Sequence, residues 1–557
     1  MNLIGNINAI PFRRFRGGGG VAPIPPFPSI TGMIARYSAL GLTNEQMTAN
    51  PVWKDLTGNG HDLQMKNFAW GGMSGVGGYK LNWSNSNTWA NYIVGGAYGT
   101  GEITNNTIHI TSAKTNNALF ETRASLKSVE YKVLIKGLTD DIYLRYGVFN
   151  DGKELWTEIK NDGIYTLPSY DYDSRYNMKW KVMSQTYPID CNITIEQLPL
   201  YPGALVFDGV DDYGVCDNFP ILTKEKGYTV VALRQWITYN PNAISAIATN
   251  ASDRSFNGAF TFENYNKGAE QTISYGATQI SLQYSKSPFS WQTTSKYNGV
   301  NIANGNKDAT NSLVLGRSYP QRNDFANFAI WELVFLDHDA TKEELTKIKD
   351  YFVKTYPWLF PDQAWTVTGK TNEDEDRATI ANITGNGNDL VLSNFGFIEG
   401  SGYNKEGEYA GYLVTDGVDD KITSSIFEMG NDWTVIGDWE LINTGKKDNA
   451  GIVKFDSIVI YNYNPILINI KNGRNNLIPD QNTVNAICSD GRIYSKDWKE
   501  SIYNEETEST SKNFLTIGYS GNSYTKIAFK NLAIYPTVLS KEDCIKAYNY
   551  LQTLKAK

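Results

Sequence analysis

Two clusters of aspartates are the residues whose types and spacing come closest to a chemical site. Each lies in the phrase Asp-Gly-Val-Asp-Asp, and the carboxylates are Asp208, Asp211 and Asp212 in the first copy and Asp416, Asp419 and Asp420 in the second. Such oxygens can bind Ca²⁺, which takes about six to eight of them. Asp-Gly also forms a tight turn in which the Asp side chain bonds its own backbone. Because both copies keep the phrase while their surroundings differ, the sequence favours a structural turn, with Ca²⁺ as the alternative.

Other reactive side chains give no catalytic pattern. The acidic run 373–376 stands in a polar stretch before Arg377 and is typical of a solvated loop. The histidines are scattered, so no metal or proton-transfer cluster follows from the spacing of His61, His109 and His338. The cysteines lack C-x-x-C spacing and are expected to be reduced thiols: Cys191, Cys216, Cys488 and Cys544. We therefore predict no catalytic pair, no cofactor and no enzyme.

Tryptophans in residues 79–203 offer a possible glycan site. The stacking candidates are Trp83, Trp89, Trp156 and Trp180. An exposed aromatic ring can stack on a sugar, whereas a buried one fills a core, because aromatic side chains dominate core burial. The sequence leaves both alternatives open.

Residues 1–28 differ from the rest of the chain. A short basic and aromatic peptide supplies the anchor candidates Phe12, Arg13, Arg14, Phe15 and Arg16. Four glycines and then four prolines follow it, a composition typical of a flexible and extended tether. The hypothesis is a docking peptide that orders on a larger partner, and the alternative is a disordered tail without a role.

Composition restricts the function classes. The formal charge of -8 and the pI near 5.2 disfavour a broad nucleic-acid-binding surface. The chain starts without the basic and apolar regions of a signal peptide, and no apolar run reaches the ~18 residues of a membrane span. The 49 glycines and the 13% aromatic content favour short strands joined by tight turns.

The elements that must position these residues occur twice. Leu-Thr-Gly-Asn-Gly-His-Asp-Leu at 56–63 returns as Ile-Thr-Gly-Asn-Gly-Asn-Asp-Leu at 383–390. The distance from this phrase to Asp-Gly-Val-Asp-Asp is about 119 residues longer in the first copy. The sequence therefore predicts a duplicated module, with an insertion in the first copy.

Matching segments predict the same strands in both copies, and a helix closes each. The strand pairs are 228–231 with 433–436, 311–316 with 513–518, and 325–331 with 529–535. Thr341 and Glu344 form a capping box, with Leu345, Ile348 and Phe352 on one helix face. Ser540 starts the equivalent helix, with Ile545, Tyr548 and Leu551 behind it. In the insertion, 129–135 and 142–149 read as strands around a turn at Gly137.

These patterns predict an all-β chain of two β-sandwich modules in tandem, the first interrupted by a small inserted β-sandwich domain. We name its parts as follows: an N-terminal tail (1–28), a first module (29–78 and 204–360), an inserted domain (79–203) and a second module (361–557).

The order of the phrases resembles the LamG-like, concanavalin A-like lectin/glucanase family. The phrases are Asp-Leu-Thr-Gly-Asn-Gly, Phe-Asp-Gly-Val-Asp-Asp, Tyr-Thr-Val-Val, Ala-Ile-Trp and Thr-Lys-Glu-Glu-Leu. The resemblance covers 33–78 with 204–357, and again 364–557. It implies jelly-roll sandwiches of two antiparallel sheets, a fold often used to bind glycans or proteins. The glucanase branch uses a Glu-x-Asp-x-x-Glu strand, and this sequence contains no Glu-x-Asp triplet.

Residues 370–387 also resemble virion proteins of tailed phages of gut Bacteroidales, the crAss-like phages included. This resemblance implies a structural virion protein displayed as a head fibre or capsid decoration and anchored by the tail. It would assemble in the host cytoplasm with other capsid or tail proteins, as a homo-oligomer such as a homotrimer, and could bind host surface glycans. The alternatives are a tail fibre or receptor-binding lectin and, less favoured, a glycoside hydrolase.

Overall fold

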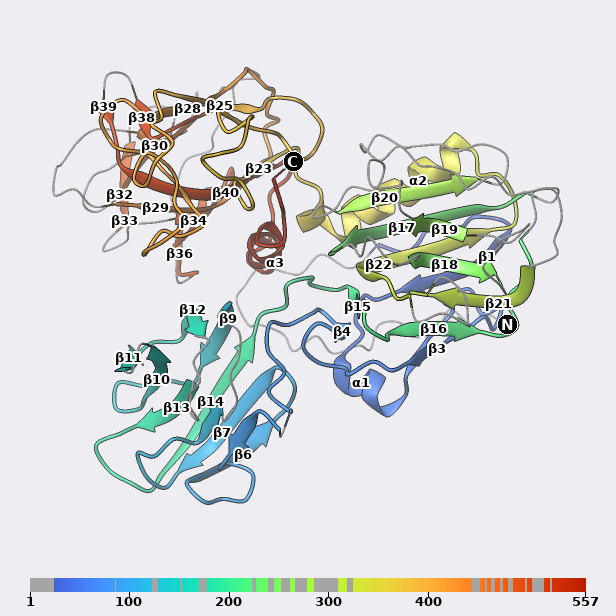
Figure 1. Cartoon of the computed structure of the whole chain (residues 1–557), viewed down its shortest axis with the longest axis horizontal. Helices are drawn as coiled ribbons and strands as arrows, with labels where there is room; N and C mark the ends of the chain where they lie inside the picture. Colours follow the sequence, from blue (N-terminus) through green and yellow to red (C-terminus); the bar gives the residue numbers. More distant parts are fainter. Residues whose placement is uncertain are drawn as a thin grey trace. The chain divides into compact units, whose positions relative to one another are not determined.

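A computed structural model gives the fold. It describes residues 25–85, 87–122, 129–150, 153–169, 178–222, 227–238, 245–251, 261–265, 278–284, 309–317, 324–442, 451–455, 458–461, 466–470, 474–478, 484–495, 498–502, 515–520 and 523–556. Antiparallel sheets dominate these residues, which confirms the predicted all-β class (Figure 1). The anchor candidates at 12–16 lie outside the described residues. Among the helices described, none has the length and apolar character that a membrane crossing requires.

The chain divides into two compact units. One combines the chain up to Gly78 with Tyr201–Leu359, and the other combines Tyr79–Leu200 with Phe360–Lys557. The first module, the inserted domain and the second module each have their own sheets.

In its described residues, the first module is a sandwich of two six-stranded sheets. One sheet has the order β20 (Gln279–Tyr284), β17 (Thr229–Trp236), β22 (Asn327–Leu336), β15 (Leu205–Asp208) and β4 (Gly75–Val76), with β1 (Met33–Ser38) also paired to β22. The other has the order β19 (Thr261–Tyr265), β18 (Ser245–Ala251), β21 (Ala309–Leu315), β16 (Tyr213–Cys216), β3 (Leu63–Lys66) and β2 (Val52–Trp53).

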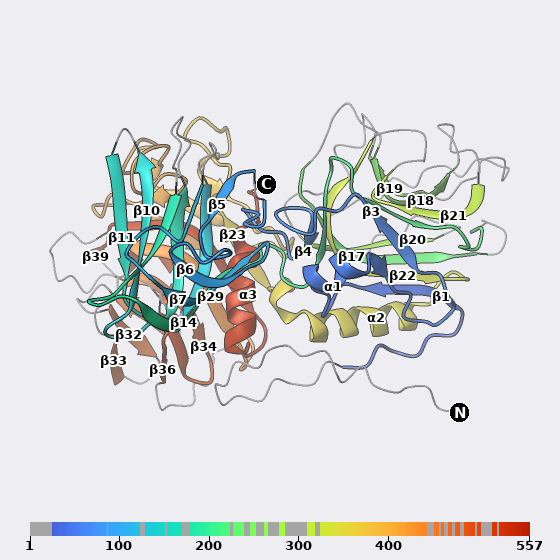
Figure 2. The same cartoon turned by 90° about the horizontal axis from the view of Figure 1, so that it is seen from below.

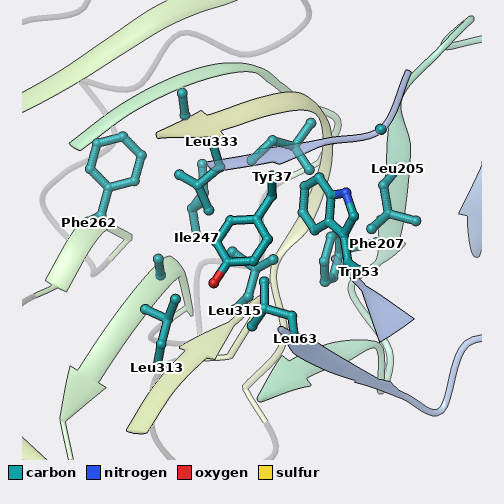
Figure 3. Close-up of a cluster of buried hydrophobic side chains, with 14 of the residues drawn as sticks. Tyr37, Trp53, Leu63, Leu205, Phe207, Ile247, Phe262, Leu313, Leu315 and Leu333 are labelled. Atoms are coloured by element: carbon teal, nitrogen blue, oxygen red, sulfur yellow. The ribbon is translucent and has the colours of Figure 1, made fainter. Parts of the chain in front are cut away.

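Apolar side chains of both sheets form one core in this module. Figure 3 shows Leu333 of one sheet and Leu315 of the other meeting around Tyr37. The ring of Trp53 lies 5.5 Å from that of Tyr37, measured between centroids. Leu63 alternates with exposed neighbours along β3, as a strand with one buried face requires.

The helices of the first module begin at threonine caps. The box predicted at Thr341 is confirmed, since Glu344 N–H donates to Thr341 Oγ1 and Thr341 N–H donates to Glu344 Oε2. It starts α2 (Lys342–Thr355), which is followed by a 3-10 turn (Pro357–Leu359) and lies against the sheet of β1 and β22 (Figure 2). A second box at Thr43 starts the short helix α1 (Asn44–Ala49), which the sequence analysis did not predict.

The inserted domain, as far as the structure describes it, is a sandwich of two five-stranded sheets. One has the order β11 (Lys153–Ile159), β10 (Tyr143–Asn150), β13 (Met178–Met183), β8 (Phe120–Thr122) and β5 (Trp89–Asn91). The other has the order β12 (Gly163–Ser169), β9 (Val129–Lys136), β14 (Ile189–Gln197), β7 (Thr107–Ala113) and β6 (Gly99–Ile103). The turn predicted at Gly137 is confirmed, because this glycine has a φ of +92° directly after β9.

The described part of the second module has two eight-stranded sheets and a small hairpin. One sheet has the order β26 (Gly402–Tyr403), β27 (Leu413–Val414), β40 (Ile527–Tyr535), β29 (Thr434–Leu441), β34 (Val484–Cys488), β35 (Arg492–Ser495) and β36 (Glu500–Ile502), with β23 (Gln363–Thr366) beside β40. The other has the order β24 (Thr379–Ile380), β25 (Leu390–Ser393), β28 (Lys421–Ser424), β37 (Thr516–Ile517), β30 (Gly451–Phe455), β31 (Ile458–Tyr461), β32 (Ile466–Ile470) and β33 (Arg474–Ile478). The hairpin consists of β38 (Tyr519–Ser520) and β39 (Ser523–Tyr524).

The closing helix of the second module, α3 (Lys541–Leu551), begins at the predicted cap Ser540. Its buried face differs from the prediction. Tyr548 and Leu551 are buried as expected, but Ile545 is only half-buried and Cys544 is buried in its place. The buried stripe therefore begins at Cys544, which shares one helix face with Tyr548 and Leu551 at i, i+4 and i+7 spacing.

The Gly-Asn-Gly phrase serves the fold in both modules. In the first module, the Asn59 side chain donates to the carbonyl oxygens of Met33 at 3.0 Å and Ile34 at 2.8 Å, at the start of β1. In the second module, Asn386 donates in the same way to the Asp362 carbonyl at 2.8 Å, directly before β23. The phrase thus ties a turn to the first strand of each module.

Candidate functional site

The aspartate cluster of the first module is built around a turn after β15. Asp208 Oδ1 accepts from the backbone N–H of Val210 at 2.7 Å and of Asp211 at 3.3 Å. Asp212 Oδ2 accepts from the Asp208 N–H at 3.0 Å, and Asp212 Oδ1 accepts from the Ser74 hydroxyl at 2.9 Å. Two of the three carboxylates therefore satisfy backbone donors of their own turn.

The second cluster repeats this pattern. Asp416 Oδ1 accepts from Val418 N–H at 2.8 Å and Asp419 N–H at 3.2 Å, and Asp420 Oδ2 accepts from Asp416 N–H at 2.8 Å. Within each cluster one carboxylate oxygen per residue lies within 4.8 Å of the others. Three side chains, two of which already accept from the backbone, supply fewer ligands than the roughly six to eight that Ca²⁺ takes. The geometry thus has a complete explanation as a repeated structural turn.

The packing around each turn leaves no room for a side chain at its glycine. Gly209 has a φ of +75°, and a Cβ at this position would lie 2.7 Å from Cβ of Asn327. Gly417 has a φ of +76°, and its Cβ would lie 3.0 Å from the backbone nitrogen of Lys526. Only glycine adopts this backbone conformation without strain, which explains why both copies keep Asp-Gly.

Burial changes the acidity of one aspartate in each turn. Loss of hydration raises the pKa of Asp212 to about 8, although its hydrogen bonds from Asp208 and Ser74 oppose the shift. The same cause raises the pKa of Asp420 to about 6. Both side chains are buried, while Asp211 and Asp419 beside them are exposed.

The raised pKa predicts a pH dependence of stability. Between pH 4 and pH 8 the folded state keeps the Asp212 proton that the unfolded chain loses, so stability should fall as the pH rises, by at most about 1.4 kcal/mol per unit. Asp212→Asn mimics the protonated acid and should flatten this part of the slope. Urea denaturation of the full chain at pH 5, 6, 7 and 8 measures it, with Asp211→Asn as the control that keeps the slope. An unchanged slope in Asp212→Asn would contradict the assignment.

The structure separates the four tryptophan candidates. Trp83 and Trp180 are each 1% exposed and Trp89 is 5% exposed, and all three belong to the core of the inserted domain. Trp89 stacks on Phe120 with ring centroids 4.3 Å apart. A ring enclosed in this way offers no face to a sugar. These three tryptophans are therefore core residues. Trp156 alone is half-buried on the outer face of its sheet.

A buried polar cluster that the sequence analysis missed lies between β1, β22 and α2. Arg36 donates from Nε and Nη2 to the two carboxylate oxygens of Glu332, each at 3.1 Å. The hydroxyl of Tyr356 donates to Glu332 Oε1 at 2.8 Å, and Arg36 Nη2 donates to the hydroxyl oxygen of Tyr351 at 2.8 Å. Burial raises the pKa of Glu332, and the contact with Arg36 opposes this shift. Arg36 and Glu332 are 296 residues apart in sequence, so no local pattern could have revealed the pair.

The Tyr356–Glu332 contact has the side chains of a glycosidase that uses a tyrosine nucleophile. Access argues against such chemistry here, because both side chains are completely buried and burial raises the pKa of Tyr356 well above its usual value. A substrate could reach neither oxygen without displacing the surrounding chain. The cluster is better explained as a bidentate ion pair that joins β1 to β22 and α2.

Phe27, near the end of the N-terminal tail, packs onto this cluster. Its ring centroid lies 4.1 Å from the guanidinium carbon of Arg36 and 4.8 Å from the ring centroid of Tyr351. A cation placed over an aromatic face is attracted by the quadrupole of the ring. The C-terminal end of the tail is therefore fixed on the first module.

Comparisons with known proteins give no family for the chain. No family model matches it, and no curated protein does. Among solved structures, a Trypanosoma rangeli sialidase in complex with sialic acid overlaps 81% of this chain and 83% of its own, with 8% identity and a TM-score of 0.26. The tandem CBM22-1–CBM22-2 domain of Xyn10C from Paenibacillus barcinonensis overlaps 48% of this chain and 99% of its own, with 9% identity and a TM-score of 0.14. Similarities this weak carry no argument about the site.

Proposed function

We propose that this chain is a structural phage virion protein with concanavalin A-like modules, displayed on the particle as a head fibre or decoration and anchored by its N-terminal tail. Its proposed partners are other virion proteins and further copies of itself, most simply in a homotrimer. The phrases shared with such virion proteins, at 370–387, suggest the class. The proposed role is binding and display, and the Tyr356–Glu332 pair, which has the side chains of one glycosidase type, is shielded from any substrate.

The observation that carries the proposal is the packing of Phe27 against the first module. A tail without a role would not need a fixed attachment to the module, yet Phe27 lies against both Arg36 and Tyr351. Fixing the base of a tether limits the volume that its free end explores, and this raises the effective concentration of the anchor at a nearby partner. The basic peptide Phe12–Arg16 would then bind acidic groups of the particle.

Deletion of residues 1–24 tests the anchor. In the phage that encodes the chain, we expect purified particles to lose the protein, because the docking peptide is removed while Phe27 and the modules stay. Quantitative mass spectrometry of the particles measures the copy number. Phe27→Ala keeps the docking peptide but loses the contacts with Arg36 and Tyr351, so it should give an intermediate copy number. A normal copy number in the deletion variant, with an unchanged unfolding temperature as the control for folding, would refute the proposal.

A receptor-binding lectin, on a tail fibre or on the head, is the second candidate. The observation that favours it is the half-buried Trp156, which lies on the outer face of a sheet instead of in the core. Binding of host glycans is compatible with either place on the particle.

A further inference from the structure

The outer face of the sheet β11-β10-β13 carries aromatic and basic side chains in adjacent rows. Cross-strand pairing places Trp156, Gly147 and Lys179 in one row. The next row contains Glu158, Arg145 and Lys181. Residues two apart on a strand share a face, so Tyr143 and Lys160 extend the same surface by one more row.

Gly147 gives the Trp156 ring its position. A Cβ on Gly147 would lie 2.5 Å from Cζ3 of Trp156 and 2.7 Å from its Cε3 and Cη2. The six-membered ring of the indole therefore lies directly over the backbone of the neighbouring strand. A ring that rests on a strand in this way is held flat along the sheet, and its position is set before any ligand arrives.

Basic groups surround this ring. The Lys181 ammonium nitrogen lies 4.7 Å from the ring centroid, and the guanidinium carbon of Arg145 lies 5.3 Å from it. Lys160 lies 5.4 Å from the Tyr143 ring in the adjoining row. The surface thus combines planar apolar ring faces with positively charged hydrogen-bond donors.

The local charge has the opposite sign to that of the whole chain. Among the described side chains of this face, the cations are Arg145, Lys160, Lys179 and Lys181, and the exposed carboxylates are Glu154 and Glu158. Glu154 pairs with Lys179, and Glu158 pairs with Lys160 at 3.0 Å and with Arg145 at 3.8 Å. A further carboxylate, Glu121 of β8, is buried and accepts from the Tyr92 hydroxyl. A surplus of positive charge therefore stands around Trp156 in a protein with a net charge of -8.

We propose that this face of the inserted domain binds an acidic polysaccharide with carboxylate-bearing sugar rings, of the polyuronate kind. The inference rests on the proposed function, because it names the ligand class of the glycan binding proposed there. The C–H face of a pyranose would stack on the Trp156 indole, which offers a large apolar area with little loss of conformational entropy. The carboxylate of the sugar would pair with Lys181 and Arg145, whose guanidinium can form two parallel hydrogen bonds to it.

The strand geometry suits a polymer better than a single sugar. Among the described side chains of this face, the aromatic ones are Trp156 and Tyr143. They lie in rows on either side of Arg145, and cations accompany both. Strand residues two apart are separated by roughly 6.5–7 Å. A chain of sugar residues could therefore contact both rings at once, and contacts repeated along one polymer increase the affinity.

Polygalacturonate binding by the full-length protein tests this inference, with neutral dextran and poly-glutamate as comparison polymers. Isothermal titration calorimetry at low salt should show binding of polygalacturonate, weaker at 0.5 M NaCl because the ionic part is screened. Trp156→Ala should weaken binding by about tenfold or more, as expected for a central aromatic contact. Lys181→Gln should weaken it by a smaller factor.

Two further variants separate the site from general effects on folding. Gly147→Ala keeps Trp156 but displaces the ring from its seat, so binding should weaken although the aromatic side chain is still present. Leu155→Ala lies on the other face of the same strand, where the side chain is exposed, and should bind as the unaltered protein does. Far-UV circular dichroism and the unfolding temperature of each variant check that the fold is retained.

Three results would overturn the inference: no binding of polygalacturonate, equal binding of dextran or poly-glutamate, or binding that Trp156→Ala and Gly147→Ala leave unchanged. The copy number of Trp156→Ala in purified particles separates this failure from failure of the proposed function. A glycan site that fails while the 1–24 deletion still abolishes incorporation would remove the ligand assignment and keep the virion role.

Discussion

Glu332→Ala is expected to lower the free energy of unfolding of the first module by about 3–5 kcal/mol. The substitution removes both acceptors of the buried Arg36 guanidinium, each now at 3.1 Å, and leaves a positive charge without its carboxylate. It also removes the acceptor of the Tyr356 hydroxyl at 2.8 Å. An unpaired buried charge costs much more than the net value of the ion pair, because water cannot replace the lost partner.

Guanidinium denaturation of the full chain, followed by circular dichroism and tryptophan fluorescence, measures this change. Glu343→Ala is the matched control on α2, since Glu343 pairs with Lys347 at 2.7 Å but its side chain is 78% exposed. Exposed pairs of this kind contribute about 0–1 kcal/mol. Equal effects of the two substitutions would show that the Arg36 cluster is hydrated and that the burial argument fails.

Trp180→Ala is expected to destabilise the inserted domain by about 3–5 kcal/mol, the range for loss of a large buried aromatic side chain. Trp180 packs on Tyr146 with ring centroids 4.7 Å apart, and it is among the largest fully buried side chains of the described residues. Its removal leaves a cavity between the two sheets that the rigid strands on either side cannot close.

Trp156→Ala, in β11 and separated from β13 by the single strand β10, provides the comparison for Trp180→Ala. Its ring lies on the outer face, so the same change should cost about 1 kcal/mol or less, as is usual for surface positions. Thermal unfolding followed by circular dichroism compares the two variants. The pair should separate the two roles, with Trp180→Ala affecting stability and Trp156→Ala affecting glycan binding. A larger loss of stability in Trp156→Ala would contradict the placement of the two rings.

Local signals in the sequence predicted much of the fold. The cap at Thr341 depends on residues three positions apart, and the strand at 325–331 repeats at 529–535, so both could be found without a structure. The same local chemistry at Thr43 was not used to predict a helix, although Gln46 completes a capping box there. In the second module the matching phrase is Thr-Asn-Glu at 371–373. There the Thr371 N–H donates to Asp374 Oδ2 at 2.9 Å and the chain forms a turn without a helix, so the repeat gave no consistent signal.

The candidate sites depended on contacts that the sequence does not encode locally. Alternation along a strand could not decide which tryptophans face the core, because Trp156 and Trp180 both lie in alternating segments and only the pairing of β10 with both neighbours separates their faces. The Arg36–Glu332 pair joins two strands that are adjacent only in the folded sheet. Phe27 was assigned to the tail by composition, yet its contacts lie in the first module.

The two points where the chain leaves and re-enters the first module are themselves paired. Tyr201 N–H donates to the Gly77 carbonyl and Gly77 N–H donates to the Ala204 carbonyl, each at 2.8 Å, next to the β4–β15 pairing of Val76 with Leu205. The pairing of β4 with β15 in the first module therefore involves only residues outside the interval 79–200. Under the proposed function, this interval is a cassette that recombination between related phages can exchange as one block. Such an exchange would change host range in a single step, while the attachment of the protein to the particle is inherited unaltered.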